Sequence, residues 1–429
     1  MTRLIEADLT WTGSRFEPGL QIGITDDGRI SSVSAKGLPG AERLSGIALL
    51  PGFVNAHSHA FQRALRGQGE RFPQGAGSFW TWREAMYRLV DDFDAASLRK
   101  VSAAAFREMR DAGITTVGEF HYLHHQREGD FSLDAAVVEA AHEAGIRMVL
   151  LYCYYASSAP GVPLREPQRH FATPTLESFW QQVDVLAHRL DPQTQTLGIA
   201  PHSIRAVGPQ EIALLYREAV RRGLPVHMHV EEQRREIEES NAAYGRSPMA
   251  VILDATQDGA FTAVHCTHTA DADMKRFLAA GGIVCLCPLT EGNLGDGIPS
   301  LAQAHTAGGR LAIGTDSNNR LAMLEEMRWL EYGQRLQHEM RGALPDGGGA
   351  VAPILLAAAT LGGAKALGLA SGAIASGCWA DLVAVDLNAP ALAGVTPEHL
   401  LEAVVFGAGN EVIAGTYVGG RWRRTGEQS

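Results

Sequence analysis

Lysine is scarce in this sequence of 429 residues. Only Lys36, Lys100, Lys275 and Lys365 occur among 37 basic residues, and 48 acidic residues leave a net charge of −11. A nucleic-acid-binding surface needs clustered positive charge to offset the phosphates, so this balance argues against a nucleic-acid partner. A small anionic substrate stays compatible with it, because such a substrate needs only one or two well-placed arginines.

Long apolar runs are also absent. No stretch of about 18 apolar residues occurs, and the first residues, MTRLIEADLTWTG, contain no run of signal-peptide length. The five cysteines are an odd number, and most lie inside apolar segments such as GGIVCLCPL. Buried free thiols in a reducing compartment fit this pattern better than a disulfide framework does. We therefore expect a cytoplasmic protein with no membrane partner.

Short apolar runs alternate with amphipathic stretches of helix length between about residues 47 and 320. The expected strands are residues 47–54, 114–120, 147–155, 196–201, 224–230, 261–266, 281–288 and 310–316. Helical patterns cover residues 94–113, 133–145, 174–190, 208–223 and 271–282. Continuous apolar strands separated by helices are typical of a parallel sheet covered on both faces. Eight in succession favour an α/β fold of the TIM type, a (β/α)8 barrel, with an open doubly wound sheet as the competing topology.

The two ends of the chain show a different pattern, with short strand-like segments and turns. Residues 1–46 alternate around turns at Asp27-Gly28 and Pro39-Gly40, and the segments WADLVAVDL and EVIAGTYVGGRW near the other end are again strand-like. We therefore expect a small composite β-sandwich domain from residues 1–48 and 371–429. Residues 49–370 then form the barrel.

Histidine and acidic residues recur where the predicted strands end. They are His57, His59, Glu119, His121, His202, His227, His229, Glu232, His265 and Asp316. In a barrel, the C-terminal ends of all strands open onto one face, and enzymes with this fold place their active sites there. A single histidine on an apolar strand is usually a core residue, but so many at strand ends indicate one shared site.

His57-Ser58-His59 is a pair of histidines separated by one residue. In an extended segment both side chains point the same way, so both imidazoles can reach one ion. The pair alone is a weak signal, but the segments HMHV (227–230) and GTDS (314–317) further along strengthen it. The metal ligands that we expect are His57, His59, His229 and Asp316. Imidazole and carboxylate suit Zn2+, and also Fe2+ or Mn2+.

Glu232 lies just beyond the HMHV strand, where the chain can turn back over the metal. A carboxylate beside an activated water is what a proton shuttle needs. We therefore predict that Glu232 moves protons, that His265 orients the water, and that Asp316 helps to accept a proton. His268, three residues after His265, is the alternative for the histidine. We interpret Glu231 as the solvated start of the following helix.

The segments PGFVNAHSHAFQRALRG, HVEEQ, VHCTH and GTDSN, in this order and spacing, resemble the amidohydrolase superfamily over essentially the whole chain. They match its mononuclear deaminase branch, which includes cytosine, guanine and adenosine deaminases. The binuclear branch carries a carboxylated lysine at the end of the fourth strand, where this chain has Pro201-His202-Ser203. The resemblance therefore implies one metal ion per chain, and a binuclear amidase is disfavoured.

A closer resemblance is to the formimidoylglutamate deiminases, on the segments HSHAFQRA, SFWTWREAMYRL, EFHYLHH, APHSIRAV and HMHVEEQ. It implies that water converts N-formimino-L-glutamate, a small dicarboxylate, to N-formyl-L-glutamate and ammonia in histidine degradation. It also implies substrate contacts from Gln62, Arg83, Tyr122, His202 and Arg205. Arginine suits this task because its guanidinium binds carboxylates in a bidentate way. Glu231 departs from the family pattern, in which a small residue is expected.

Relatives of this kind are often homodimers, and the aromatic segment Phe79-Trp80-Trp82 suits either a lid or a dimer contact. Two alternative functions stay open. One is a deaminase of a heterocycle such as guanine or cytosine, with the same fold and metal. The other is an inactive barrel that serves as a scaffold. Two arginines at the pocket argue against a neutral base, and the intact ligand set argues against a scaffold.

Overall fold

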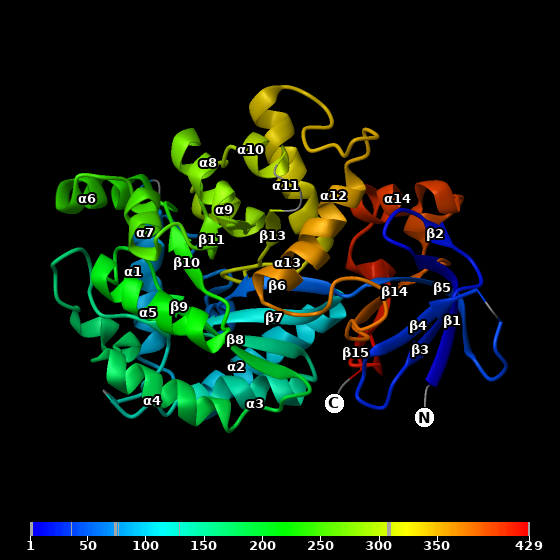
Figure 1. Cartoon of the computed structure of the whole chain (residues 1–429), viewed down its shortest axis with the longest axis horizontal. Helices are drawn as coiled ribbons and strands as arrows, with labels where there is room; N and C mark the ends of the chain where they lie inside the picture. Colours follow the sequence, from blue (N-terminus) through cyan, green and yellow to red (C-terminus); the bar gives the residue numbers. More distant parts are fainter. Residues whose placement is uncertain are drawn as a thin grey trace.

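The structure is a computed structural model that describes residues 3–35, 37–72, 75, 77–127, 129–306 and 310–427. Within these residues, parallel strands form two four-stranded sheets (Figure 1). The first sheet contains β6 (Phe53–Ser58), β7 (Ile114–His121), β8 (Arg147–Tyr154) and β9 (Gln195–Pro201). The second contains β10 (His227–Val230), β11 (Thr262–His265), β12 (Ile283–Leu286) and β13 (Leu311–Ile313).

Single parallel bridges join these two sheets at both edges. Ile199 of β9 pairs with Val226, which precedes β10, and Ser58 of β6 pairs with Asp316, which follows β13. The amide of Ile199 also donates to the carbonyl of Pro225 at 2.8 Å. The ring of strands is therefore continuous, which confirms the predicted (β/α)8 barrel over the open doubly wound sheet.

Helices alternate with the strands and cover the outside of the barrel (Figure 1). Those predicted from the sequence are α2 (Ala95–Asp111), α3 (Asp134–Ala144), α4 (Leu176–Ala187), α5 (Pro209–Arg222) and α8 (Asp271–Ala279). The other described α-helices are α1 (Phe79–Val90), α6 (Arg234–Tyr244), α7 (Pro248–Thr256), α9 (Pro288–Leu294), α10 (Ala302–Thr306), α11 (Met323–His338), α12 (Ala352–Ala357), α13 (Gly363–Ala366) and α14 (Leu400–Gly407). Short 3-10 and π turns are η1 (Ala60–Leu65), η2 (Glu166–Phe171), η3 (Ala358–Gly362), η4 (Pro390–Leu392), η5 (Pro397–His399) and η6 (Asn410–Val412).

Both ends of the chain contribute to one further sheet. Its strands are β1 (Arg3–Trp11), β2 (Phe16–Glu17), β3 (Gln21–Ile24), β4 (Ile30–Ser34), β5 (Glu42–Pro51), β14 (Leu382–Asp386), β15 (Ile413–Val418) and β16 (Arg421–Arg424). The order β16-β15-β14-β5-β1-β3-β4 places strands from the two ends side by side, with β2 paired to β1 (Figure 1). The division of the chain at residues 48 and 371 stays a prediction.

The strand expected over residues 47–54 is two strands. Residues up to Pro51 belong to β5 in the composite sheet, and the barrel strand β6 begins at Phe53. Gly52 separates them and donates its amide to the carbonyl of Asp381 at 2.9 Å. A Cβ at Gly52 would lie 2.2 Å from Oγ1 of Thr115. The close approach of β7 therefore requires glycine at this division, which an apolar run in the sequence does not reveal.

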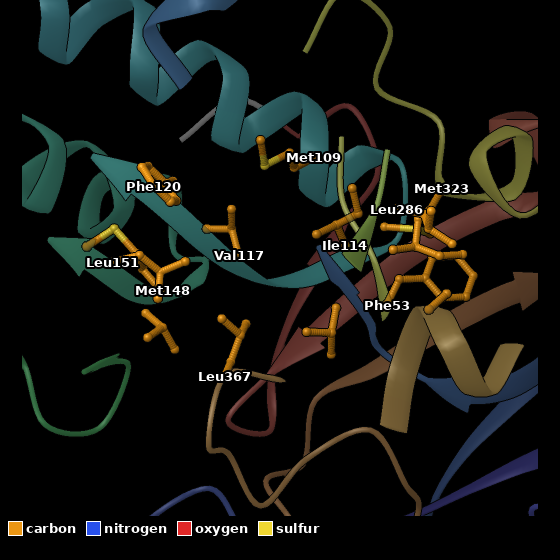
Figure 2. Packing of buried hydrophobic residues seen from close by; sticks show 14 of the residues in the cluster. Phe53, Met109, Ile114, Val117, Phe120, Met148, Leu151, Leu286, Met323 and Leu367 are labelled. Atoms are coloured by element: carbon orange, nitrogen blue, oxygen red, sulfur yellow. The ribbon is translucent and has the colours of Figure 1, made fainter. Parts of the chain in front are cut away.

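Side chains from several strands fill the interior of the protein. β7 and β8 are buried along their whole length, as expected for strands covered on both faces. Figure 2 shows Phe53, Val117, Met148 and Leu286 in this cluster, together with Met109 from α2. Full burial of such a side chain stabilises the fold by about 1.5–3 kcal/mol. The strands are thereby held rigidly, and so are the residues at their C-terminal ends.

A buried ion pair connects the barrel to the composite sheet. Arg147, the first residue of β8, donates to both carboxylate oxygens of Asp381, at 2.6 and 3.1 Å. Asp381 directly precedes β14 and also accepts the amide of Gly419 at 2.7 Å. Both side chains of the pair are buried.

Within the described part of the chain, no helix is long and apolar enough to cross a membrane.

Replacing Arg147 with methionine leaves the Asp381 carboxylate buried without its cation. Removing one partner of a buried pair costs about 3–5 kcal/mol, so we expect R147M to unfold at a clearly lower urea concentration than the wild type. R15M removes an exposed partner of Glu17 and is the matched control, with an expected change below about 1 kcal/mol. Equal unfolding midpoints for R147M and the wild type would show that the pair does not hold these parts together.

Candidate metal centre and substrate pocket

Four predicted ligands meet at the C-terminal end of the barrel. His57 and His59 come from β6, His229 from β10, and Asp316 from the loop after β13. All four are buried, and one ligand atom from each lies within 4.8 Å of the others. Nε2 of His229 is 3.2 Å from that of His57 and 3.4 Å from that of His59. Oδ1 of Asp316 is 3.4 Å from Nε2 of His57 and 3.3 Å from Nε2 of His59.

These separations fit ligands of one shared ion. Atoms bound at about 2.0–2.1 Å to the same zinc ion lie about 2.9–3.6 Å apart at the bond angles of four- and five-coordinate sites. The four separations given above run from 3.2 to 3.4 Å. Three imidazole nitrogens and one carboxylate are also ligands that zinc accepts. The residues present therefore fit one divalent transition-metal ion.

Hydrogen bonds fix which ring nitrogen of His59 and of His229 faces the centre. Nδ1 of His59 donates to the carbonyl of Phe120 at 2.8 Å, and Nδ1 of His229 donates to the carbonyl of His202 at 3.1 Å. The Nε2 lone pairs are therefore free for coordination. Burial lowers the pKa of His59 to about 3 and also lowers the pKa of His229. Neutral imidazole is the form that binds metal ions.

Hydrogen bonds distinguish the two histidines of β10 and indicate which one can bind the metal. Nε2 of His227 donates to the carbonyl of Ala366 in α13 at 2.8 Å, away from the four-residue cluster. Burial lowers its pKa to about 3, so it is a neutral core residue. His229 lies at the cluster, two residues nearer the end of the strand.

His265 lies beside the metal cluster and faces three carboxylates. Its Nε2 is 3.9 Å from Glu232 and 3.8 Å from Oδ2 of Asp316, and its Nδ1 is 3.2 Å from Glu291 of α9. Burial lowers the pKa of His265, but the charge of Glu232 and the hydrogen bond to Glu291 outweigh it and raise the pKa to about 10. His265 is therefore placed as a candidate hydrogen-bond donor beside the cluster. The alternative, His268, is partly exposed and is not among the residues that line the pocket.

Glu231 is not the solvated start of a helix. Its side chain is buried, and its carboxylate accepts the amide of Met249 at 3.0 Å, at the beginning of α7. Helix α6 begins only at Arg234, and Glu231 has a left-handed backbone with φ 54°. The tight turn after β10 directs this side chain inward, which charge pattern alone does not predict.

Left-handed backbone recurs around the centre in residues other than glycine. Such residues are Glu231, His265, Cys266, Asp316 and Asn318, with φ between 45° and 73°. Each such residue stores about 1–3 kcal/mol of strain, which the surrounding structure has to hold. Two of them, His265 and Asp316, carry side chains of the site, so the strain fixes where these side chains point.

Two polar residues that sequence reasoning gave no role support the His57-Ser58-His59 segment. Asn318 donates to Oγ of Ser58 and to the carbonyl of His59, both at 3.0 Å. Glu119 of β7 accepts the amide of Ala60 at 2.7 Å, and burial raises its pKa to about 8. The signals were present in the sequence, because Asn318 belongs to the GTDSN segment and Glu119 stands at a strand end.

His121, which also stands at a strand end, does not join the metal centre. It hydrogen-bonds to Asp134 at 2.9 Å, as does His124 at 2.8 Å. Tyr152 and Gln182 donate to the second oxygen of Asp134, both at 2.9 Å. Protein donors therefore satisfy this carboxylate, and the cluster is a buried hydrogen-bonded network between the barrel and its helices.

A cavity of about 60 Å³ lies over the metal cluster. All five residues that the resemblance assigned to substrate binding line it, namely Gln62, Arg83, Tyr122, His202 and Arg205. His59, His229, Glu232, His265 and Asp316 line the same cavity. Gln62 donates to the hydroxyl of Tyr122 at 2.7 Å. Sequence reasoning missed Tyr155 and Ser158, which follow β8, and Phe171, which ends η2; all three also line the cavity.

The aromatic segment of α1 borders this cavity. Phe79 and Trp82 line it, and Trp80 lines a larger cleft of about 1280 Å³. Arg83, Arg205, Trp82 and Ser158 line both spaces, so they stand where the inner cavity meets the outer cleft. The segment therefore lies at the mouth of the site.

The two arginines of the cavity differ in their partners. Arg205 donates to Oε2 of Glu232 at 3.2 Å. Arg83 stacks on the ring of Trp80 at 4.5 Å, and its buried Nε has no hydrogen-bond partner among the described residues. Burial lowers the pKa of Arg83, and the positive charge of Arg205 lowers it further. An anion between the two guanidiniums would relieve this repulsion.

A model of the amidohydrolase family matches residues 48–423 of the sequence. The chain belongs to the amidohydrolase family. Formimidoylglutamate deiminase of Pseudomonas aeruginosa is 40% identical over 402 residues, which cover 91% of this chain and 88% of that protein. A 5-methylthioadenosine/S-adenosylhomocysteine deaminase of Haloquadratum walsbyi is 29% identical over 83% of this chain and 74% of that protein.

Solved structures of two amidohydrolase relatives share the fold. An amidohydrolase from Brucella melitensis has a TM-score of 0.85 and 33% identity, and the match covers 98% of this chain and 94% of that chain. An adenosine deaminase from Xanthomonas campestris with bound zinc has a TM-score of 0.82 and 25% identity, over 98% and 92% of the two chains. Family membership identifies this amidohydrolase as a metal-dependent hydrolase of carbon–nitrogen bonds.

The choice between the two histidines of β10 can be tested by metal analysis. We expect H229A to lose its metal ion during gel filtration, because a ligand at the cluster is gone. H227Q keeps a hydrogen-bond donor to the carbonyl of Ala366 and should retain the ion in the wild-type amount. Metal content measured by inductively coupled plasma mass spectrometry decides the assignment, and loss of metal from H227Q but not from H229A would reverse it.

Proposed function

We propose that this amidohydrolase hydrolyses N-formimino-L-glutamate to N-formyl-L-glutamate and ammonia. The observation that carries the proposal is the pair Arg83 and Arg205, which face one cavity over the metal cluster. The substrate has two carboxylates, and two guanidiniums at the cavity complement them. The 40% identity to formimidoylglutamate deiminase over 91% of this chain supports the same reaction.

The chemistry of the proposed reaction divides among the residues of the site. His57, His59, His229 and Asp316 would hold one Zn2+ ion, which supplies the Lewis acidity that activates water at neutral pH. The oxygen of that water bonds to the amidine carbon, and the bond from this carbon to the terminal nitrogen breaks. Glu232 transfers both protons of the water to this nitrogen, the first as the C=N double bond becomes single and the second as the remaining C–N bond breaks, so that ammonia leaves and the oxygen stays as the formyl carbonyl.

In this proposal His265 orients the attacking water, and Gln62 helps to hold the substrate. His265 is held by Glu291 and donates a hydrogen bond to the attacking oxygen as negative charge develops there. Asp316 helps to accept the proton of the water. Gln62, with Tyr122 at 2.7 Å, and His202 hold the formimino end over the cluster. The buried cavity excludes bulk water from the reacting atoms.

A heterocycle deaminase fits the same cavity less well. Neutral bases such as guanine or cytosine carry no carboxylate for Arg83, whose buried Nε lacks a hydrogen-bond partner in the described structure. A neutral ligand would leave the charge of Arg83 uncompensated, whereas Arg205 already has Glu232 and Glu236 within 4 Å. Zinc rather than iron or manganese, a homodimer, a cytoplasmic location and a place in histidine degradation remain parts of the proposal.

The substrate assignment is tested by the release of ammonia from zinc-loaded protein. We expect rapid release from N-formimino-L-glutamate and none from guanine, cytosine or adenosine under the same conditions. Release from a heterocycle, with none from the formimino acid, would contradict the proposed substrate and leave the metal site intact.

Glu232 can be tested separately from the metal. E232Q removes the proton acceptor but keeps the volume and polarity of the side chain, so we expect a normal zinc content. Turnover should fall by a factor of about 10²–10⁴, the usual contribution of a positioned general base. E238Q on the exposed face of α6 is the control and should behave like the wild type. Wild-type turnover by E232Q would exclude Glu232 as the proton shuttle.

Arg83 is expected to recognise a carboxylate. R83M removes a charged hydrogen bond worth about 1.5–3 kcal/mol, so kcat/KM should fall about ten- to a hundredfold with unchanged zinc content. R88M, one turn further along α1 and exposed, is the matched control. The kinetic constants of both variants are compared by steady-state ammonia release, and equal values for R83M and R88M would remove Arg83 from the substrate site.

A further inference from the structure

Arg205 stands between two buried carboxylates. One of its terminal nitrogens donates to Oε2 of Glu232 at 3.2 Å, and its Nε lies 3.7 Å from Oε2 of Glu236. Glu232 is the proposed proton shuttle, whereas the mechanism above gives Glu236 no role. Burial lowers the pKa of Arg205, but the charges of Glu236 and Glu232 outweigh it and raise the pKa above its ordinary value.

The contact between Arg205 and Glu236 is incomplete. Nε of Arg205 and Oε2 of Glu236 are both buried, and neither has a hydrogen-bond partner among the described residues. An unsatisfied buried polar group costs about 1–3 kcal/mol. At 3.7 Å the two atoms are just too far apart for a hydrogen bond, so a shift of less than about 1 Å would satisfy both.

Glu236 is held in a fixed position near the guanidinium of Arg205. It lies on the first turns of α6, its side chain is 0% exposed, and its Oε1 accepts the amide of Glu231 at 3.2 Å. Burial raises the pKa of Glu236 to about 7, and the charge of Arg205 opposes this rise. A firmer contact with the guanidinium would therefore favour the ionised carboxylate.

Arg205 also lies where a substrate carboxylate would arrive. It lines both the inner cavity and the outer cleft. A carboxylate that binds its terminal nitrogens competes with Glu232 for the same donors. The guanidinium can then turn toward Glu236 through Nε, which already approaches Glu236 and is a different donor from the terminal nitrogen that binds Glu232.

We propose that Glu236 is a positioning residue that receives Arg205 when a substrate carboxylate binds, and that this exchange frees Glu232 for proton transfer. The inference rests on the proposed function, because it takes the substrate to be a carboxylate-bearing amidine. Before substrate binds, Glu232 is held by Arg205. After it binds, Arg205 is shared between the substrate carboxylate and Glu236. Carboxylate binding is thereby coupled to the chemical step.

The coupling can be measured by dividing the substrate at the bond between its α-carbon and nitrogen. Formamidine then supplies the reacting group, and glutarate supplies the two carboxylates. Water attacks the carbon of formamidine, one carbon–nitrogen bond breaks, and formamide and ammonia form. In the zinc-loaded wild-type protein, we expect saturating glutarate to stimulate ammonia release from formamidine by about tenfold or more, although glutarate takes no part in the bonds that change.

E236Q keeps the volume of the side chain and an oxygen for the amide of Glu231, but it removes the charge that receives Arg205. We expect E236Q to bind glutarate within about threefold of the wild-type affinity, by calorimetry, and to lose the stimulation. E238Q, exposed on the same helix, should retain both binding and stimulation. Zinc content and circular dichroism verify that each variant is folded.

Three results would overturn the inference. Wild-type protein that hydrolyses N-formimino-L-glutamate without glutarate stimulation of formamidine shows that no coupling exists, whatever the variants do. Equal stimulation in E236Q and the wild type shows that Glu236 does not receive Arg205. Parallel loss of glutarate binding and stimulation in E236Q shows a merely structural role. Failure of the proposed function is distinct, because the wild type would then not hydrolyse N-formimino-L-glutamate at all.

Discussion

The eighth strand of the barrel reaches the first through the segments that carry three of the four metal ligands. The amides of Thr315 and Asp316 both donate to the carbonyl of His57 at 3.0 Å, and the amide of His59 donates to the carbonyl of Asp316 at 2.9 Å. The contacts that close the ring therefore also bring three of the metal ligands together. The fourth ligand, His229, is fixed to the neighbouring strand by the hydrogen bond from its amide to His202 at 3.0 Å.

This constraint explains why the surrounding structure is strained and buried. Asp316 reaches the centre with a left-handed backbone, and Asn318, also left-handed, ties the turn back to Ser58 and His59. Such conformations persist only where neighbouring contacts enforce them. The apolar layer of β7 and β8 supplies that support (Figure 2), because both strands are buried along their whole length. Packing energy in the core thus holds the geometry at the strand ends.

Charge in the pocket follows a second rule, which is that each buried cation needs a partner. Arg205 has two carboxylates within 4 Å, and His265 has three. Arg83 has stacking contacts with Trp80 and Tyr87, and its Nε has no acceptor within the described chain. A dicarboxylate substrate completes this arrangement, whereas a neutral ligand leaves it unbalanced. The electrostatics and the coordination chemistry of the site thus favour the same class of substrate.

Much of this architecture was predictable from the sequence because it depends on the spacing of apolar residues and on which residues stand at strand ends. Continuous apolar strands predicted the barrel, and residues at strand ends predicted the centre. The sequence could not predict the break at Gly52, because it depends on how closely Thr115 of β7 approaches. It could not predict the burial of Glu231, which depends on one left-handed residue. The pairing of Arg205 with Glu232 and Glu236 likewise joins the loop after β9 to the loop after β10 and to α6, and these distances are a property of the folded chain alone.

We propose that three imidazoles and one carboxylate from β6, β10 and the β13 loop hold a single ion. X-ray absorption at the zinc edge of the zinc-loaded protein tests it most directly. We expect the zinc ion to have a shell of nitrogen and oxygen atoms at about 2.0–2.1 Å, with multiple scattering from three imidazole rings and no sulfur. A sulfur ligand at about 2.3 Å would contradict it. Such a ligand would place the ion instead with Cys287, His265 and Asp316, whose ligand atoms also lie within 4.8 Å of one another.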